Sequence, residues 1–451
     1  MVILGVDIGT SKVAAVLLDS EGTLCGVSSL LHEADMHSPA GHAEQDPSRL
    51  FEAVVHSVQA LPAEIRRTVA AVGITGQMHG VVLADASGHP VSPLITWQDL
   101  RCEQAGFLRE LQQRTGYTLN SGFGCATLAH LAAQGQLPKL AKTSGTIGDW
   151  LVARLCGRSR CVTDPTNAAS WGLFDLAALR WDMQAVQAAE ITAELLPEVV
   201  PCSSNAGYLS EAMAQGLGVP AGIPVAAALG DNQASLLATL TQPDVELGLT
   251  LGTGGQLSAV MQAGWKMAQP GAEARFEYRP YVGGRYVAVA SALCGGSAWQ
   301  WMAGSVENWL ETLDVKGPTR EELYARMDEL GLRAAGRLEV RPHFRGERYD
   351  SSLRGSITGI GIDDFTLGNL ARGLARGIVE NLANMLPQEV LKGRTRVVGS
   401  GNALRRSRLL RAMATEVLGA DLVMSDHQEE AACGAAKNAL IMLQRKSICN
   451  R

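Results

Sequence analysis

One pattern of apolar and polar positions occurs twice along the chain. Residues 3–18 form an apolar run, a Gly-Thr-Ser turn and a second apolar run, and residues 247–260 repeat this plan around Gly252, Thr253 and Gly254. Short apolar runs on either side of a glycine turn are typical of strands in a hairpin. The pattern therefore predicts two similar hairpins, one in each half of the chain.

The first half of the chain alternates helical and β-like runs. Residues 47–61 have the apolar spacing of a helix, with Asp46 as its N-cap and Pro47 at its first position. Apolar runs over residues 69–75 and 80–84 predict two strands joined by a Gln-Met-His turn. Such an alternation is typical of an α/β fold.

A further apolar run predicts the middle of a sheet. Residues 223–229 are apolar at every position, as in a strand that is buried on both faces. Gly230 and Asp231 end this run, and a helix is expected to start at Asn232.

The length of the chain and the repeat together predict two domains. A chain of 451 residues exceeds what one hydrophobic core usually holds. The hairpin pattern restarts after residues 241–244, so we expect an N-terminal domain over residues 1–240 and a C-terminal domain over residues 241–451.

Composition excludes several classes of function. A formal net charge of −6 argues against nucleic acid or an anionic membrane as the partner. The sequence holds no apolar run near the ~18 residues of a membrane span and no secretion signal. Nine cysteines lack the spacing of a disulfide framework, so we expect reduced thiols and a cytoplasmic protein.

The two glycine turns have the composition of phosphate-binding turns. Glycine lacks a Cβ, so backbone N–H groups and a threonine hydroxyl can surround an anion. Two such turns suggest that a polyphosphate is bound from both sides. The first copy carries Asp7 where the second has Thr250, and one carboxylate would suit a single Mg²⁺ shared with phosphate oxygens. Two tight hairpins without a ligand are the alternative.

Two other positions suit phosphoryl transfer. Gly399 and Gly401 stand between an apolar run and a predicted helix, an arrangement found at nucleotide sites and also in ordinary strand–helix turns. Asp231 lies at the carboxyl end of a predicted strand, where ligands bind to α/β sheets. Transfer of a phosphoryl group to an alcohol needs one base, and Asp231 is the candidate; a helix N-cap is its alternative role.

The acceptor would have to lie beside that carboxylate. The turn Gln77-Met78-His79 offers neutral donors to sugar hydroxyls, and Trp97 with Asp99 forms a polar–aromatic cluster. The structural alternatives are a surface loop for His79 and a core anchor for Trp97.

Five motifs in one order carry a family resemblance: Asp7-Ile-Gly-Thr10, Gly76-Gln-Met-His-Gly80, Gly230-Asp231, Gly252-Thr253-Gly254 and Gly399-Ser-Gly-Asn402. In this order and over essentially the whole chain, they resemble the FGGY carbohydrate kinases. The resemblance implies two ribonuclease H-like domains of the actin/Hsp70/hexokinase type around a central cleft. It also implies ATP and Mg²⁺ in that cleft, with the sugar held mainly by the N-terminal domain.

The resemblance assigns a role to each matching residue. Asp231 would be the base and, with Asp7, a metal ligand. The remaining residues divide into three sets: Thr10, Ser11, Lys12, Gly252, Thr253 and Gly254 at the phosphates; Gly399, Gly401 and Asn402 at adenosine; and Gln77, Met78, His79, Trp97, Asp99 and Asn232 at the sugar.

Local motifs narrow the substrate. Residues 76–80 look like the ketose branch that includes xylulokinases, and not like glycerol kinases, which carry an Arg-Glu pair there. Residues 96–102, 122–127 and 167–172 look like sedoheptulokinases, which phosphorylate the C7 hydroxyl of sedoheptulose. A Gly-Asp-Asn triplet such as the one ending at Asn232 is also common among xylulokinases, where the Asn touches the sugar.

The sequence therefore predicts an ATP-dependent ketose kinase, with sedoheptulose as the expected acceptor and a xylulokinase as the alternative. Its partners would be a small-molecule ketose and MgATP. An actin- or Hsp70-like ATPase that drives a partner would share both glycine turns, but it would not need the Gln-Met-His turn. A sugar-sensing regulator without turnover is a third alternative, and the presence of both Asp7 and Asp231 argues against it.

Overall fold

The computed structural model describes residues 1–267, 274–336 and 338–449, and the chain divides into two compact units. Unit 1 comprises Met1–Thr239, Pro280–Gly284 and His427–Arg451, and unit 2 comprises Leu240–Arg279 and Arg285–Asp426. The sequence predicts one C-terminal domain over residues 241–451. The contacts group the chain from His427 onward with unit 1, because the last helix packs on the unit 1 sheet.

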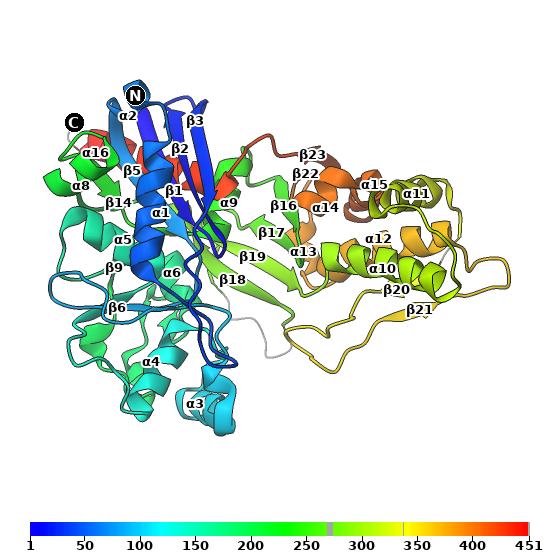
Figure 1. Cartoon of the computed structure of the whole chain (residues 1–451), viewed down its shortest axis with the longest axis horizontal. Coiled ribbons are helices and arrows are strands. Elements are labelled where there is room, and N and C mark those ends of the chain that lie inside the picture. Colours follow the sequence, from blue (N-terminus) through cyan, green and yellow to red (C-terminus); the bar gives the residue numbers. More distant parts are fainter. Residues whose placement is uncertain (268–273, 337, 450–451) are drawn as a thin grey trace. The chain divides into compact units, whose positions relative to one another are not determined.

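Unit 1 is built on a seven-stranded sheet with the strand order β13-β14-β5-β1-β2-β3, and β15 also pairs with β5 (Figure 1). β1 and β2 form the predicted first hairpin, and β5 lies parallel to β1. The strands span β1 (Val2–Ile8), β2 (Lys12–Asp19), β3 (Leu24–Leu31), β5 (Val69–Gly76), β13 (Asn205–Tyr208), β14 (Pro224–Ala226) and β15 (Leu229–Gly230).

The single strand predicted over residues 223–229 is wrong, because it is interrupted between β14 and β15. At the break, the amide nitrogen of Ala227 donates to the carbonyl oxygen of Ser204 (2.9 Å). The carbonyls of Ala227 and Ala228 accept from the side-chain amides of Asn438 and Asn167, each at 3.1 Å. Side chains therefore replace the strand ladder at this point. The predicted burial on both faces is confirmed.

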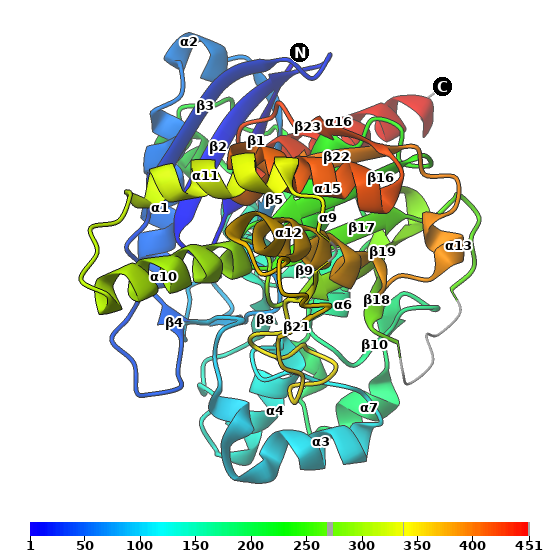
Figure 2. The same cartoon turned by 90° about the vertical axis from the view of Figure 1, so that its right-hand side faces the viewer.

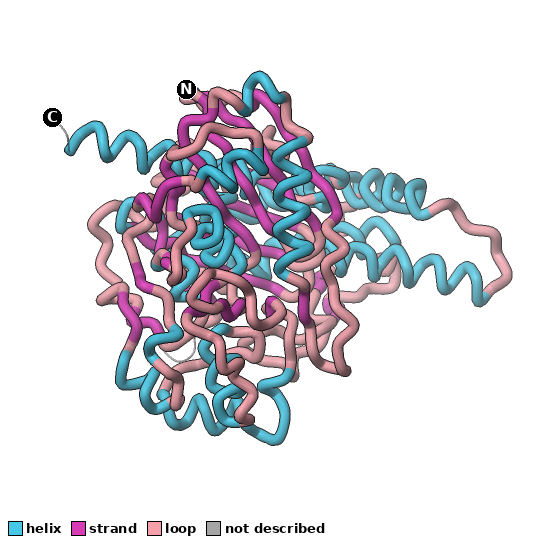
Figure 3. The backbone as a smooth tube through the Cα atoms, turned by 60° about the vertical axis from the view of Figure 1, so that its left-hand side comes forward, coloured by secondary structure: helices cyan, strands magenta, loops and turns pink. Residues whose placement is uncertain are grey.

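Helices cover both faces of this sheet (Figure 3). Along β1, alternate residues face opposite ways. Leu4, Val6 and Ile8 pack in the core that contains α1 (Pro47–Gln59) and α5 (Ile147–Cys156). Ile3 packs in the core beneath α9 (Asp231–Thr239) and α16 (Glu430–Cys449). Any polar side chain of β1 with the parity of Ile3 therefore faces α9 and α16.

Helix α1 begins as the sequence predicts. The side chain of Asp46 accepts from the backbone N–H of Ser48 at 2.8 Å, and Pro47 occupies the first turn. Leu50, Val54 and Val58 recur at helical spacing and are buried against the sheet. The predicted N-cap and helix are confirmed.

Helix α16 lies directly on the sheet backbone. A Cβ at Gly5 of β1 would collide with the carbonyl oxygen of Ala432, and one at Gly73 of β5 would collide with that of Ala435. On its other side, Gly434 of α16 meets the backbone of Ala234 in α9 in the same way. The small residues at the start of α16 therefore permit backbone-to-backbone packing with two strands and one helix.

Unit 1 has a second hydrophobic core, which contains Leu111, Leu128 and Trp171, and several shorter elements complete the unit. They are α2 (Ala63–Arg66), α3 (Phe107–Thr115), α4 (Gly124–Ala133), α6 (Pro165–Ser170), α7 (Met183–Ala188), α8 (Glu211–Leu217), the 3₁₀ turns η1 (Arg101–Gly106), η2 (Ala193–Leu195) and η3 (Val282–Gly284), and four strand pairs: β4 (Glu44–Gln45) with β7 (Leu94–Ile95), β6 (Val82–Ala84) with β8 (Thr143–Gly145), β9 (Val162–Thr163) with β12 (Glu198–Val199), and β10 (Phe174–Asp175) with β11 (Arg180–Trp181).

Unit 2 contains a six-stranded sheet whose central strands pair as those of unit 1 do. Three neighbouring strands form antiparallel pairs, as β1, β2 and β3 do, and a later strand joins the first in parallel, as β5 joins β1. In unit 2 an edge strand comes between the second and third of these in sequence. The order is β18 (Phe276–Tyr281), β19 (Arg285–Ala292), β17 (Gly255–Val260), β16 (Glu246–Leu251), β22 (Arg396–Ser400) and β23 (Asp421–Met424). Both predicted hairpins and the α/β class are confirmed.

The helices of unit 2 pack against this sheet and one another. Figure 2 shows α11 and α15 beside α12, and α12 also contacts β17 and β19. The elements are α10 (Gly296–Thr312), α11 (Arg320–Arg333), α12 (Leu367–Ala383), α13 (Gln388–Leu391), α14 (Asn402–Arg406), α15 (Arg408–Leu418) and the pair β20 (Glu339–Arg341) with β21 (Ser356–Thr358).

Among the described residues, no helix has both the length and the apolar character that crossing a membrane requires. The eight cysteines whose side chains are described are all free thiols. Burial raises the pKa of the Cys161 thiol to about 12, so this thiol is protonated at neutral pH.

The packing of α16 yields a stability prediction. Gly73→Ala should destabilise the protein by about 1–3 kcal/mol, because the added methyl group must displace the backbone of Ala435. The midpoint of thermal unfolding, followed by circular dichroism, should fall by about 2–4 °C per kcal/mol. Gly216→Ala in α8 is the control, because no described atom lies within 4 Å of a Cβ there. Equal midpoints for the two variants would contradict the packing.

Candidate active site

The two carboxylates that the sequence singled out lie at one edge of the unit 1 sheet. Asp7 of β1 pairs in register with Thr75 of β5, and Thr75 pairs in turn with Leu229 of β15. Asp231 follows two residues after Leu229 and is the first residue of α9. The parallel strands β1, β5 and β15 all end here, so both carboxylates stand at a carboxyl-end edge, where α/β sheets bind ligands.

The same edge holds an ion pair on the same face of the sheet. Asp7 shares the parity of Ile3, and Lys12 shares that of Ala14 and Val16, so both side chains face α9 and α16. Lys12 Nζ donates to both carboxylate oxygens of Glu429, the residue before α16, at 2.6 and 2.7 Å.

The charges at this edge are unbalanced. Asp7 Oδ1 is buried and has no hydrogen-bond partner among the described residues. Burial raises the pKa of Asp7 to about 7, with further increases from the carboxylates of Asp231 and Glu429, whereas Lys12 lowers it. Three carboxylates and one ammonium would carry a net charge of −2 when all are ionised. A divalent cation would relieve this repulsion.

The donor set suits a magnesium ion that is shared with a substrate. Within the described part of the chain, no three His, Cys, Asp or Glu side chains gather into a metal site. Mg²⁺ is commonly held by one or two carboxylates together with substrate phosphates and water. Asp7, with its unpartnered Oδ1, and Asp231 fit this pattern.

The first glycine turn, residues 9–11, is held through the backbone of Thr10. The carbonyl oxygen of Thr10 accepts from His32 Nε2 (3.0 Å) and from Gln45 Nε2 (2.8 Å). The hydroxyl of Thr10 accepts from the indole N–H of Trp97 at 3.0 Å. Ser11 at the tip of the turn is exposed. The turn is therefore fixed from one side by three side chains.

Gln77 connects this turn to the residues that are predicted to face the sugar. Its Nε2 donates to Gln45 Oε1 at 2.8 Å, and its backbone N–H donates to Ile8 at 2.8 Å. Its Oε1 is buried and has no hydrogen-bond partner among the described residues. This oxygen is an acceptor suited to a ligand hydroxyl group.

His79 is held in an uncommon backbone conformation. Its φ is +74°, in the left-handed region that non-glycine residues rarely adopt. Its backbone N–H donates to Ser170 Oγ (3.1 Å), its Nδ1 donates to the Ser170 carbonyl (2.7 Å), and its ring stacks on Phe123 at a centroid distance of 4.8 Å. A loosely placed surface loop therefore does not describe His79.

Met78 and Asn232 flank the carboxylate of Asp231. Met78 is buried, and its Cε would lie 2.8 Å from a Cβ at Gly230, so it packs beneath the Gly230–Asp231 turn. The backbone N–H of Asn232 donates to Asp231 Oδ1 at 2.6 Å. Both residues thus lie beside the candidate base.

Trp97 and Asp99 have different environments. Trp97 is 44% exposed, so the core-anchor alternative is wrong for it. Asp99 is 1% exposed, and both its oxygens accept hydrogen bonds from Arg101, with one more from the backbone of Ala43 at 2.8 Å. Arg101 also pairs with Glu44 at 2.5 Å. Asp99 therefore fixes the loop that carries Trp97, a role that leaves its oxygens occupied.

In unit 2, the second glycine turn rests on the start of α10. The carbonyl oxygen of Gly252 accepts from the N–H of Gly296 (2.7 Å), and that of Thr253 accepts from Gly295 (3.1 Å) and Ser297 (3.0 Å). A Cβ at Gly295 would collide with the backbone of Gly254. Gly252 and Thr253 themselves are exposed at the tip of the turn.

The turn after β22 lies against the second glycine turn. Gly401 has φ +88°, and a Cβ there would collide with the backbone of Leu251, the residue before Gly252. Thr250 and Ser400 share a hydrogen bond of 2.8 Å between their hydroxyls. Gly399 lies in β22, and α14 begins at Asn402, so the predicted strand, glycine turn and helix are confirmed. Unit 2 thus brings its two glycine-containing turns together.

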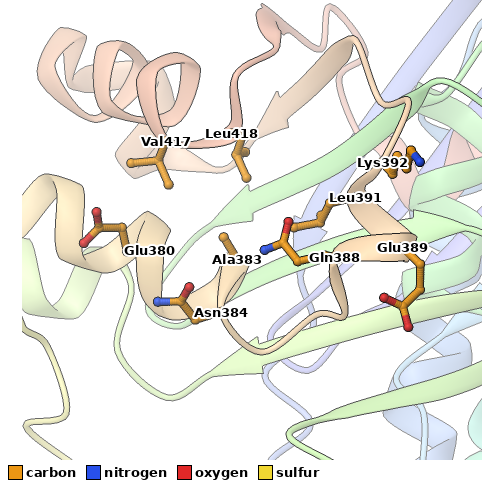
Figure 4. Close-up of a pocket in the computed structure, with 9 residues that line it drawn as sticks. All are labelled: Glu380, Ala383, Asn384, Gln388, Glu389, Leu391, Lys392, Val417 and Leu418. Atoms are coloured by element: carbon orange, nitrogen blue, oxygen red, sulfur yellow. The ribbon is translucent and has the colours of Figure 1, made fainter.

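A further cavity lies elsewhere in unit 2. It has a volume of about 700 Å³ and is lined by residues at the ends of α12, α13 and α15, including Glu380, Gln388 and Leu418 (Figure 4). Lys392 in its wall precedes β22, whereas Gly401 follows β22, so the cavity lies at the opposite end of that strand. None of the predicted site residues, all of which are described, lines it.

Sequence reasoning missed several residues of the site. Gln45, Ser170 and Glu429 contact predicted residues from distant parts of the chain. Ser170 lies in the motif of residues 167–172, but the motif does not indicate a contact with His79. Gly295 and Gly296 form a Gly-Gly pair that is visible in the sequence, but their role depends on contact with a turn more than 40 residues earlier in the chain.

Comparison with known proteins places these features in a family. Residues 2–238 match the model of the FGGY family of carbohydrate kinases, N-terminal domain. The sedoheptulokinase of Homo sapiens is 34% identical to the chain, over 98% of this chain and 97% of that protein.

Solved structures share the fold. A protein described as a xyloylose kinase from Brucella ovis superposes with a TM-score of 0.83 at 24% identity, over 99% of this chain and 91% of that one. The glycerol kinase of Plasmodium falciparum, solved with ADP, gives a TM-score of 0.77 at 21% identity, over 98% of this chain and 90% of that one. Sugar kinases of this kind have two ribonuclease H-like domains and use ATP as the phosphate donor. The chain belongs to the FGGY family of carbohydrate kinases.

Proposed function

We propose that this kinase transfers the γ-phosphoryl group of ATP to the terminal hydroxyl of a ketose, with sedoheptulose as the acceptor. The observation that carries the proposal is that the carboxylates of Asp7 and Asp231 interact at one edge of the unit 1 sheet, where β5 leads into the turn of Gln77 and His79. The identity to a sedoheptulokinase over nearly the whole chain supports the seven-carbon acceptor.

The proposed division of labour follows the two hairpins. The N-terminal domain, residues 1–240 in the sequence analysis, would bind the sugar through Gln77, His79, Trp97 and Asn232. The unpartnered Gln77 Oε1 suits a hydroxyl donor, and the exposed indole of Trp97 suits the apolar C–H face of a sugar. We propose indirect roles for Met78, which supports the Asp231 turn, and for Asp99, which supports Trp97.

The phosphate and adenosine roles follow the glycine turns. In unit 1, Thr10, Ser11 and Lys12 would contact phosphate oxygens. In unit 2, the exposed turn Gly252-Thr253-Gly254 would do so, and Gly399, Gly401 and Asn402 at the adjacent turn would bind adenosine. The start of α10 beneath the second turn adds backbone support, because it occupies the carbonyls of Gly252 and Thr253 and so directs the other face of the turn outward.

The chemistry requires little covalent participation by the protein. The acceptor hydroxyl oxygen forms a bond to the γ-phosphorus, the bond from that phosphorus to the β–γ bridging oxygen breaks, and ADP leaves with the electron pair. The hydroxyl proton passes to a carboxylate oxygen of Asp231. Bound Mg²⁺, held by Asp7 and Asp231, would supply charge neutralisation at the phosphates. Alignment of acceptor and donor then accounts for most of the remaining rate enhancement.

The compartment that we propose is the cytoplasm, because the described cysteines are free thiols and no described helix could span a membrane. The second candidate acceptor is xylulose, which the Gly-Asp-Asn triplet at Asn232 favours.

A substrate panel tests the reaction and the acceptor together. ADP release from MgATP should be stimulated strongly by sedoheptulose and weakly by xylulose, ribulose, fructose and glycerol. A preference for xylulose would keep the reaction and replace the acceptor. ADP release that no sugar changes would contradict the kinase proposal and favour a partner-driven ATPase.

The base assignment makes a separate prediction. Asp231→Asn should lower sugar-dependent turnover by at least ~10²-fold, while ATP still binds, because the hydroxyl proton loses its acceptor. Asp182→Asn is the matched control, since Asp182 is the N-cap of α7 and asparagine caps helices equally well. Near-normal turnover of Asp231→Asn, measured in a coupled ADP assay, would remove Asp231 from the base role.

His79 should affect the sugar more than the nucleotide. We expect His79→Asn, which tolerates a left-handed backbone, to raise the KM for the ketose by ~10-fold and to leave the KM for ATP within about 2-fold. His130→Ala, which removes a buried histidine that packs on Phe107 in the second core, is the control. An increase in the ATP KM alone would show that the turn of residues 77–79 is misassigned.

The second glycine turn makes the opposite prediction. Gly295→Ala should raise the KM for ATP by ~10-fold or more, because its methyl group displaces Gly254 from below the turn. Gly304→Ala in the same helix is the control, since only the end of the Arg320 side chain lies near a Cβ there, at 3.9 Å. Steady-state kinetics with each substrate varied in turn separates the effects. An unchanged ATP KM would refute a phosphate role for this turn.

A further inference from the structure

Helix α6 connects the candidate base to the candidate sugar-binding histidine. Its first turn contacts the segment that leads into Asp231, and its last residue, Ser170, contacts His79. The helix has only six residues and is buried almost throughout. The proposed roles of the glycine turns, the metal and the sugar-facing side chains do not include it.

The first of these contacts is a chain of two hydrogen bonds. The Thr166 hydroxyl donates to Asp164 Oδ1 at 2.5 Å, and the backbone N–H of Gly230 donates to the Thr166 hydroxyl oxygen at 2.8 Å. Asp164 also caps α6 through the backbone N–H groups of Thr166 (2.9 Å) and Asn167 (3.2 Å). One carboxylate oxygen thus fixes both the start of the helix and the direction of the threonine hydroxyl.

The direction of these bonds is determined by chemistry. An ionised carboxylate only accepts hydrogen bonds, so the single proton of the Thr166 hydroxyl points to Asp164. The lone pairs of that hydroxyl are then left to accept from Gly230. Asp164 and Thr166 are 0% and 1% exposed, so bulk water cannot readily replace either partner.

Gly230 depends on this bond for its position. The strand β15 has two residues, Leu229 and Gly230, and ends directly at Asp231. The ladder with β5 also holds Leu229 and Gly230, and two more side-chain bonds support the segment: Thr75 Oγ1 donates to the carbonyl of Leu229 (2.6 Å), and Asn167 Nδ2 donates to that of Ala228 (3.1 Å). The strand ladder and these side chains together place the peptide that carries Asp231, and on the α6 side the bond to Thr166 holds the Gly230 N–H.

The far end of α6 acts on His79. The Ser170 hydroxyl donates to the carbonyl of Asn167 (2.7 Å) and accepts from the backbone N–H of His79 (3.1 Å). The Ser170 carbonyl accepts from the His79 ring. The same short helix therefore sets the position of the base at one end and of the histidine at the other.

We propose that Thr166, held by Asp164, is a positioning residue for the base Asp231, and that α6 fixes the distance between the base and the bound acceptor hydroxyl. This inference rests on the proposed function, because it assumes that Asp231 receives the hydroxyl proton. Thr166 does not touch the substrate. It acts by holding the N–H of Gly230, and its loss lets the Asp231 carboxylate shift away from the hydroxyl.

The test is Thr166→Val, which keeps the shape of the side chain and removes the hydroxyl. We expect kcat for the ketose to fall by ~10–100-fold, because a displacement of about 1 Å can cost ~10²-fold in rate. The KM values for the ketose and for ATP should each stay within ~3-fold, because neither set of binding residues is removed. Thr166→Ser, which restores the hydroxyl, should recover kcat to within ~3-fold of the parent.

Thr143→Val is the matched control. Thr143 is also buried, and its hydroxyl also accepts a backbone N–H, that of Cys161 at 3.0 Å, in β8. A loss of hydroxyl bonding that acts only through stability should affect both valine variants alike. A kcat for Thr166→Val equal to that of Thr143→Val, or no recovery in Thr166→Ser, would overturn the inference.

Two further measurements keep the outcome interpretable. Asp231→Asn is assayed alongside: if it retains turnover, the proposed base fails, and if it loses turnover while Thr166→Val does not, only the positioning inference fails. If Thr166→Val does not fold, as judged by circular dichroism, Thr166→Cys replaces it, since a thiol is a weak acceptor of similar size. A Thr166→Cys enzyme with the parent kcat would then overturn the inference.

Discussion

Unit 1 depends on the direct contact of α16 with the backbones of β1, β5 and α9. Gly5, Gly73 and Gly434 make the contact possible, and any side chain at these positions would separate the layers. Once α16 lies there, its start brings Glu429 to Lys12, and its side brings α9 close enough for Asp231 to raise the pKa of Asp7. The chemistry of the edge is thus a consequence of how closely three backbones approach.

The close packing brings like charges together, and the rest of unit 1 must hold them there against their repulsion. Three carboxylates near one lysine repel one another, and the pKa of Asp7 is raised by burial first and by this repulsion second. A loosely packed unit would relax by separating the charges. Here the sheet register fixes Asp7, the backbone contact fixes α9, and the bond from Gly230 to Thr166 fixes the turn between them. A cation that binds between the carboxylates is stabilised because it relieves charge repulsion that the fold already holds in place.

Local signals in the sequence were sufficient to predict most helices and hairpins, but they did not predict which side chains contact one another across the fold. The hairpins, the N-cap Asp46 and the glycine turns depend on neighbouring residues, and the structure has them. The break between β14 and β15 depends on Asn167 and Asn438, which are distant in sequence, so the run of apolar residues gave no sign of it. For the same reason Asp99 resembled a ligand for hydroxyls, although Arg101 and Ala43 occupy its oxygens. The spacing of apolar residues along the chain indicates which residues are buried, but it does not indicate their hydrogen-bond partners.

The comparison of the two hairpins explains how one fold can serve two roles. Two residues before the glycine turn, unit 1 has Asp7, whose Oδ1 is buried and has no hydrogen-bond partner among the described residues. At the matching position unit 2 has Thr250, whose hydroxyl shares a hydrogen bond with that of Ser400. The Asp7 side chain can carry a negative charge and has an oxygen without a hydrogen-bond partner among the described residues, whereas the Thr250 side chain is neutral and hydrogen-bonded. A neutral turn can approach phosphates without a competing carboxylate, and a charged edge can hold a cation and a base. We therefore propose that this one difference at matching strand positions adds a cation and a base beside the phosphate contacts of the first turn and leaves the second turn with phosphate contacts alone.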